Sequence, residues 1–323
     1  PPAGGSFEFD SRSAYAQSWK RALRPWRKHP AVGALKAALG RGLSQAGAQR
    51  SMLYLSRPPA LKALRPWENS GVHGPLLEAL RAFARDTGFG ELWAARRRER
   101  RAWISEVGAQ RESMDFIALM EEYSGMKVRA GYAVILAPLL PAGGGGALNH
   151  LGRDRAAGGY FVTSTVGPTD FPKGRARFLL APHRMAFWHE LGHVLLDGLL
   201  ENHQGEVEKS RGLLTPASRD RYGSWEQTAR EHIVQGLASR MVDWASERGL
   251  ARGKVRRVRE NFLPYIDETA QLYREYESAR ARYPTLAAFY PRVMEFFTGL
   301  AKRRRGRARD WAPRGARAHD GLV

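Results

Sequence analysis

The stretch HRMAFWHELGHVLLDGLL, residues 183–200, is the most informative part of the chain. Apolar side chains recur through it at helical spacing, and Pro182 stands where proline favours the start of a helix. His189 and His193 are four residues apart, which in a helix places both imidazoles on one face. Glu190 follows the first of them directly. The stretch therefore predicts a rigid helix that presents two histidines and a carboxylate together.

This pattern is the HExxH motif, in which the two histidines bind one zinc ion. The intervening Glu190 does not bind the ion; it can take a proton from a zinc-bound water and pass it to a leaving amine. The alternative interpretation is a surface helix whose histidines meet this spacing by chance. Phe187, Trp188 and Leu191 argue against it, because unliganded histidines and a glutamate are costly to bury among apolar side chains. We therefore expect one zinc ion per chain.

A catalytic zinc needs a third protein ligand and one open position. The residues alone leave the candidates Asp197, His203, Glu226, Glu231 and His232. Asp197 lies one turn after His193 and is better placed to orient a ligand than to be one. Glu226 and Glu231 belong to a second predicted helix, residues 224–244. Helical periodicity does not choose between these two glutamates.

The segment WEQTAREHIV, residues 225–234, resembles the second zinc-site helix of the gluzincin metallopeptidases. More narrowly, the chain is similar to an uncharacterised bacterial family with an HEFSH-like motif and a later helix that carries a glutamate. Stretches such as HPAV, residues 29–32, extend this similarity over most of the chain. The resemblance implies a zincin-like core, Glu231 as the third ligand, and peptide-bond cleavage by a zinc-bound water with Glu190 as general base.

The resemblance also implies how a substrate binds. In gluzincin-like folds a peptide pairs as an extra strand with a sheet edge above the zinc helix, and residues 160–166 would be that edge. The oxyanion donor of such sites is usually Tyr, His or Arg, so Tyr222 is our second catalytic candidate, with His232 as the alternative. The chain departs from the family's usual residues at Leu191-Gly192, Asp197 and Gln235.

The remaining chain predicts a mostly helical α+β fold. Four helical patterns precede residue 126, at residues 13–23, 32–43, 75–86 and 90–107. The period becomes strand-like at residues 132–140 and 160–166, and the four glycines at 143–146 between them indicate a flexible hairpin connection. After the zinc helix, helices are expected at residues 224–244, 255–280 and 285–301. The helix from 224 has a clear start signal, because Ser224 and Gln227 form a capping box.

These patterns suggest three regions. Residues 1–126 would be an N-terminal helical region that packs on the core. Residues 127–301 would be the zincin-like catalytic core with its small sheet. Residues 302–323 would be a disordered basic tail, because the run from Lys302 to Arg309 holds six cations in eight positions, where like charges repel.

The formal net charge is +20, from 52 Lys and Arg against 32 Asp and Glu. The cations are scattered along the chain, which favours a solvated basic surface. An electrostatic contact with an anionic surface is the other interpretation, and it does not require nucleic acid. Our second functional hypothesis is therefore a basic polyanion- or cell-surface-binding protein with a structural or degenerate metal site.

Other features narrow the class of protein. There is no cysteine, which excludes a thiol nucleophile and a cysteine-ligated zinc. No apolar run approaches the roughly 18 residues needed to cross a bilayer. The sequence starts at Pro1 without an initiator methionine, and a removed leader would make the protein extracytoplasmic or secreted; otherwise it is cytoplasmic. We expect a monomer that acts on a peptide or protein substrate.

Overall fold

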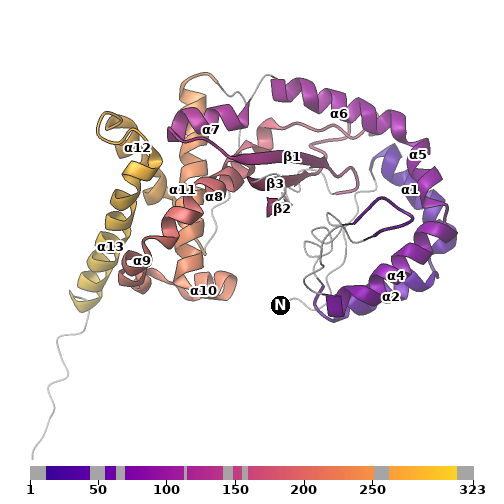
Figure 1. The fold of residues 1–323 in the computed structure, drawn as a ribbon, viewed down its shortest axis with the longest axis horizontal. Helices are drawn as coiled ribbons and strands as arrows, with labels where there is room; N and C mark the ends of the chain where they lie inside the picture. Colours follow the sequence, from indigo (N-terminus) through magenta and orange to yellow (C-terminus); the bar gives the residue numbers. More distant parts are fainter. Residues whose placement is uncertain are drawn as a thin grey trace, which may run out of the picture. The chain divides into compact units, whose positions relative to one another are not determined.

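The structure, a computed structural model, describes residues 12–43, 55–62, 70–112, 115–140, 148–154, 159–250 and 262–310. These residues form a mostly helical α+β protein with one small sheet (Figure 1). The chain divides into two compact units: Pro1–Asp115 with Ala130–His183, and Phe116–Arg129 with Arg184–Val323. The division expected at residue 126 is therefore not the one found. The strands belong with the N-terminal helices, and the segment from Phe116 belongs with the helix that carries His189 and His193.

The helices of the first unit are α1 (Ala14–Leu23), η1 (Arg24–Trp26), α2 (Pro30–Gly40), α4 (Ser70–Asp86), α5 (Phe89–Ala95) and α6 (Arg97–Glu112), followed after the sheet by the short turns η2 (Pro172–Gly174) and η3 (Ala181–His183). His29 caps α2, since its Nδ1 accepts the amide of Ala31 at 3.1 Å. The expected helix over residues 90–107 is two helices. Arg96 leaves the helical conformation between them and packs its guanidinium over the ring of Trp19 at 4.4 Å.

The sheet of the first unit has the order β1-β3-β2. Its strands are β1 (Ala130–Leu136), β2 (Leu148–Asp154) and β3 (Gly159–Val166). Strand β3 pairs in parallel with β1 and antiparallel with β2. Residues 160–166 therefore lie in the central strand, and the expectation that they form a substrate-binding edge is wrong, because both sides of β3 are already hydrogen-bonded.

Strand β2 had no sequence prediction. Its sequence, LNHLGRD, has none of the β-branched and aromatic residues that favour strands, so only its pairing with β3 identifies it. The hairpin of this sheet joins β2 to β3. The glycines at 143–146, interpreted as a hairpin connection, lie outside the described residues and precede β2.

The second unit consists of α7 (Phe116–Ser124), α8 (Arg184–Glu201), α9 (Gln204–Lys209), η4 (Arg211–Leu213), α10 (Pro216–Tyr222), α11 (Trp225–Glu247), α12 (Ile266–Ser278) and α13 (Leu286–Asp310). Helix α11 is central and packs against α8 and α12, among others. The predicted capping box begins it, since Oγ of Ser224 accepts the amide of Gln227 at 3.2 Å. The helix expected over 255–280 is shorter where the structure describes it: residues 262–265 are not helical, and α12 begins at Ile266.

A buried charge network fixes α11 in place. Arg240, only 3% exposed, donates from Nε and Nη2 to Glu277 of α12 at 2.6 and 2.7 Å. It also bonds both carboxylate oxygens of Glu247, at 2.8 and 2.7 Å. The hydroxyl of Tyr123, on α7, donates to the same Glu277 at 2.8 Å. Because a buried cation is costly unless it is fully paired, this network holds three helices in one arrangement.

Helix α13 continues to Asp310, so the boundary expected between the fold and a tail at residue 302 lies inside a helix. Arg, Lys and Ala are strong helix formers and let the helix extend once residues 286–301 have packed. Arg304 anchors the extension by donating to the hydroxyl of Tyr265. Residues 311–323 lie outside the described part of the chain.

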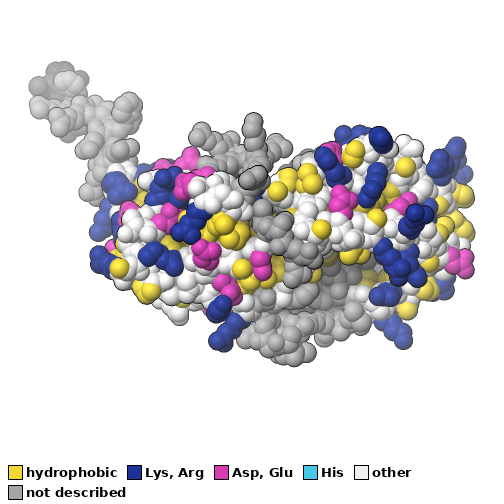
Figure 2. All heavy atoms as spheres, turned by 90° about the horizontal axis from the view of Figure 1, so that it is seen from above, with side chains coloured by type: hydrophobic (Ala, Val, Ile, Leu, Met, Phe, Trp, Pro, Cys, Tyr) yellow, Lys and Arg dark blue, Asp and Glu magenta, His cyan; other side chains and the backbone are white. Residues whose placement is uncertain are grey.

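The basic composition is visible at the surface. Lys and Arg side chains are spread over the face shown in Figure 2, and acidic side chains are fewer. Within the described residues, no helix combines the length and the apolar character that a bilayer-spanning segment needs.

Candidate metal centre

The candidate centre depends on a close approach of α8 and α11. A Cβ atom added at Gly192 would lie 2.9 Å from Cγ1 of Val234, a distance that real Cβ contacts do not reach. Only glycine therefore lets the helices come this near. Gly192 directly precedes His193, so this close approach of α11 falls beside the histidine pair.

Three side chains, those of His189, His193 and Glu231, meet at this approach. Nε2 of His189 lies 3.1 Å from Nε2 of His193. Oε2 of Glu231 lies 3.4 Å from the first of these nitrogens, and Oε1 of the same carboxylate lies 3.8 Å from the second. Ligands held at roughly 2.0–2.1 Å by a tetrahedral zinc ion are about 3.3 Å from one another. The three side chains therefore have the spacing of a metal-binding set.

Glu190 completes the group. Its Oε1 lies 3.8 Å from Nε2 of His189, and the glutamate side chain is 12% exposed. His189, Glu190 and His193 each offer a ligand atom within 4.8 Å of the others. A carboxylate so close to the two imidazoles is available for proton transfer beside a bound ion.

The protonation of the two histidines differs. Burial, together with the charge of His193, lowers the pKa of His189 to about 3. Burial also lowers the pKa of His193, but the hydrogen bond and charge of Asp197, with the charges of Glu231 and Glu190, outweigh it and raise the pKa. His189 is thus neutral at neutral pH, which is the form that binds metals.

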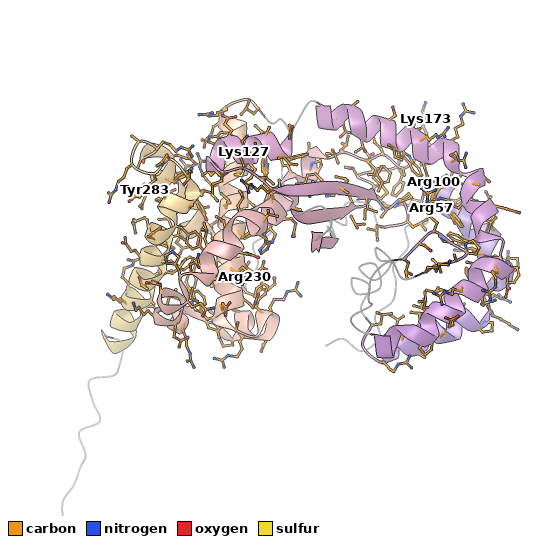
Figure 3. The ribbon with its side chains drawn as sticks, viewed as in Figure 1. Arg57, Arg100, Lys127, Lys173, Arg230 and Tyr283 are labelled. Atoms are coloured by element: carbon orange, nitrogen blue, oxygen red, sulfur yellow. The ribbon has the colours of Figure 1, made fainter. Side chains whose placement is uncertain are left out.

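Asp197 orients His193, as the sequence predicted. Its Oδ1 lies 3.0 Å from Nδ1 of His193, which leaves Nε2 of that ring to face the other ligand atoms. The other carboxylate oxygen accepts a hydrogen bond from Nη1 of Arg230 at 3.2 Å. Arg230, labelled in Figure 3, projects from α11, so the contact joins the two helices that carry the ligand atoms.

The contacts of Arg230 also distinguish Glu226 from Glu231, the two glutamates that the sequence left as alternatives for the third ligand. Its Nη2 lies 3.6 Å from Oε1 of Glu226, so Glu226 faces the arginine while Glu231 faces the histidines. Sequence reasoning did not single out Arg230. The spacing of Glu226 and Arg230, four residues apart on one helix, was the signal that could have indicated their pairing.

Residues 74–296 match a family described as a domain of unknown function, DUF4932. The chain belongs to the DUF4932 family. The match runs from α4 into α13 and includes every residue of the metal centre described above. Among curated proteins and among solved structures, nothing matches the chain significantly.

Two other predicted site residues of the DUF4932 chain are placed elsewhere. His232 is fully buried, with Nδ1 2.8 Å from the carbonyl of Thr228 and Nε2 accepting the amide of Tyr265 at 3.2 Å. Both ring nitrogens are used, so His232 is neither a metal ligand nor an oxyanion donor here. Tyr222 ends α10 with its ring packed against Phe262, at 5.7 Å between centroids, and its catalytic role stays a prediction.

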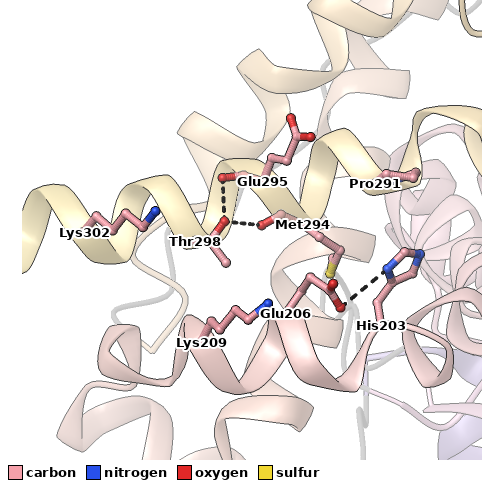
Figure 4. A pocket seen from close by; sticks show the side chains of 8 residues that line it. All are labelled: His203, Glu206, Lys209, Pro291, Met294, Glu295, Thr298 and Lys302. Carbon is pink, nitrogen blue, oxygen red and sulfur yellow. Dashed lines mark hydrogen bonds and ion pairs between the residues drawn. The ribbon is translucent and has the colours of Figure 1, made fainter.

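The remaining ligand candidate, His203, lines a cavity of about 520 Å³ in which α9 and α13 carry most of the lining residues (Figure 4). Its Nδ1 lies 3.8 Å from Oε2 of Glu206, and its ring packs on Tyr290 at 5.4 Å between centroids. The structure thus brings together His189, His193 and Glu231 and leaves His203 outside the group.

Proposed function

We propose that this DUF4932 protein is a zinc-dependent hydrolase, a metallopeptidase of gluzincin type. One zinc ion per chain would be held by His189, His193 and Glu231. The observation that supports this most is the spacing of 3.1–3.8 Å among the two Nε2 atoms and the Glu231 carboxylate oxygens, on two helices that Gly192 lets approach. When bound, zinc acidifies a water molecule and polarises the carbonyl that the water attacks.

The side chains around the ligands supply the rest. Glu190 takes the proton of the attacking water as general base and returns it to the leaving amine as general acid. Its low exposure keeps the carboxylate largely out of bulk solvent. Asp197 holds the ring of His193, and Tyr222 is our candidate for the donor to the developing oxyanion. The substrate is a peptide or a protein.

The test has two stages, because a substrate has to be found first. Metal analysis of the purified protein should give one zinc per chain, and a peptide library should be cleaved by the zinc-loaded protein. Glu190→Gln should retain the zinc, and its turnover rate should be roughly 10²–10⁴-fold lower, because glutamine cannot accept the proton.

Glu201→Gln is the matched control, since Glu201 is an exposed residue at the end of the same helix. It should cleave at the rate of the unmodified protein. Unchanged turnover in Glu190→Gln, with zinc retained, would contradict the mechanism. Absence of bound zinc would contradict the function altogether.

A further inference from the structure

The first unit carries an exposed basic and apolar patch on α5 and α6. Of the large hydrophobic side chains that are exposed in the described part of the chain, Ile104 and Trp93 are the most exposed, at 65% and 48%. Single exposed hydrophobic residues are common on soluble proteins. These two are distinguished by what surrounds them.

Arginines flank Ile104 along one stripe of α6. Arg97 and Arg101 lie seven and three residues before it, so the three side chains share a face of the helix. Both arginines are exposed. Neither forms an ion pair with any residue that the structure describes. Two acidic residues of α6, Glu99 and Glu106, fall on the opposite side by helical periodicity, and Glu106 pairs with Arg175 at 3.2 Å.

Arg100 joins the two exposed hydrophobic residues into one surface. It lies four residues before Ile104 on α6, and its guanidinium packs over the ring of Trp93 on α5 at 3.8 Å. The same side chain, labelled in Figure 3, donates to the carbonyl of Trp93. We call the surface formed by Trp93, Arg97, Arg100, Arg101 and Ile104 the α6 patch.

We propose that the α6 patch binds the surface of a bilayer that contains anionic phospholipids. Guanidinium groups pair with lipid phosphates, while Trp and Ile side chains enter the boundary between headgroups and acyl chains. A cationic helix face that carries exposed apolar side chains matches this partner in both charge and chemistry. This role is independent of the proposed hydrolase activity.

Single-stranded nucleic acid fits the patch less well. Bases bind such proteins by stacking on exposed aromatic rings. The ring of Trp93 already stacks with Phe89, at an interplanar angle of 17°, and Arg100 packs over one of its faces. Ile104 offers a base neither a π face nor a hydrogen-bonding group. The apolar part of the patch therefore favours lipid over a base.

The test uses the full chain and vesicles of phosphatidylcholine with or without about one third phosphatidylglycerol. We expect flotation with the anionic vesicles only, weakening as salt rises. Each arginine near such a surface strengthens binding by roughly fivefold, so Arg97→Gln with Arg101→Gln should weaken it by roughly 25-fold. Ile104→Ser should weaken it by roughly fivefold at every salt concentration.

The matched control replaces Arg219 and Arg221, two exposed arginines of α10, with glutamine. It removes the same charge and should bind within about twofold of the unmodified protein. An equal loss in this control would overturn the proposal, since only net charge would then matter. So would binding that survives the α6 variants, or tighter binding to single-stranded DNA than to vesicles with the same dependence on Arg97 and Arg101.

Discussion

Asp197 lies 3.0 Å from Nδ1 of His193 and reaches Arg230 of the facing helix with its other oxygen. The carboxylate thus sets the orientation of a proposed ligand and links the helices that supply the ligand set. Loss of a hydrogen-bonded partner typically lowers metal affinity by roughly 10–100-fold, because the ligand ring is no longer held in its binding orientation.

We therefore expect Asp197→Asn to weaken zinc binding by roughly 10–100-fold, measured by competition with a fluorescent chelator. Asp220→Asn, at an exposed position on α10, is the control and should leave the affinity unchanged. Equal affinity of Asp197→Asn and the unmodified protein would show that Asp197 has no part in positioning the ligand.

Glu231 and Glu226 form a matched pair of variants on one helix. Glu231→Gln should reduce zinc affinity by more than about 100-fold, because removing a ligand costs more affinity than removing the residue that orients a ligand. Glu226→Gln should have a much smaller effect, because Glu226 contacts Arg230 at 3.6 Å and not the histidines. Zinc content after dialysis distinguishes them. The reverse order of effects would assign the third ligand to Glu226.

Gly192→Ala tests the close approach of α8 and α11. The added methyl group would lie 2.9 Å from a branched side chain, Val234, so either that side chain or the two helices must shift. We expect a loss of about 1–3 kcal/mol in the free energy of unfolding, as for other overpacked cores, and weaker zinc binding. Thermal denaturation with and without zinc measures both.

Gly198→Ala is the control on the same helix, because a Cβ atom there meets nothing within 4 Å. Alanine is the better helix former, so this variant should be more stable by up to ~1 kcal/mol and bind zinc normally. If both glycine variants behaved alike, the contact with Val234 would not limit the approach of the helices.

His232 predicts how stability depends on pH. Burial lowers the pKa of His232 to about 4, because removal from water disfavours the charged ring. The folded protein therefore keeps the ring neutral. The unfolded chain takes up the proton near pH 6.5, so the stability present above that pH is lost as the pH falls towards 4, by roughly 1.4 kcal/mol per unit. His232→Gln should be less stable at pH 7 and lose less stability between pH 6.5 and 4.

Chemical denaturation at pH 7, 6, 5 and 4 measures this slope. His203→Gln serves as the control, because His203 is partly exposed at a cavity wall. It should keep the pH dependence of the unmodified protein. A slope in His232→Gln equal to that of the unmodified protein would show that other groups cause the acid sensitivity.

The sequence by itself determined the features that depend on neighbours along the chain. The spacing of His189 and His193 required a helix that presents both rings on one face, and α8 is that helix. Ser224 and Gln227 fixed the start of α11 through a local hydrogen bond. Asp197, one turn beyond His193, could be assigned an orienting role for the same reason: helical periodicity relates residues within a few turns.

Only the tertiary structure decided what depends on contacts between distant segments. Periodicity placed Glu226 and Glu231 on one helix but could not say which faced the histidines. That depended on the register of α11 against α8, set by the contact of Gly192 with Val234 and by the pairing of Arg230 with Asp197. Both contacts join residues more than thirty positions apart, where no repeating pattern connects them.

The position of β3 in the sheet also depended on a contact between separate segments. The β-rich stretch at 160–166 was recognised from its branched side chains, but its central position came from pairing with β2, whose polar sequence has little strand preference. A strand of low preference forms because a partner satisfies its backbone hydrogen bonds. The identity of that partner is a property of the folded chain, and the local sequence does not contain it.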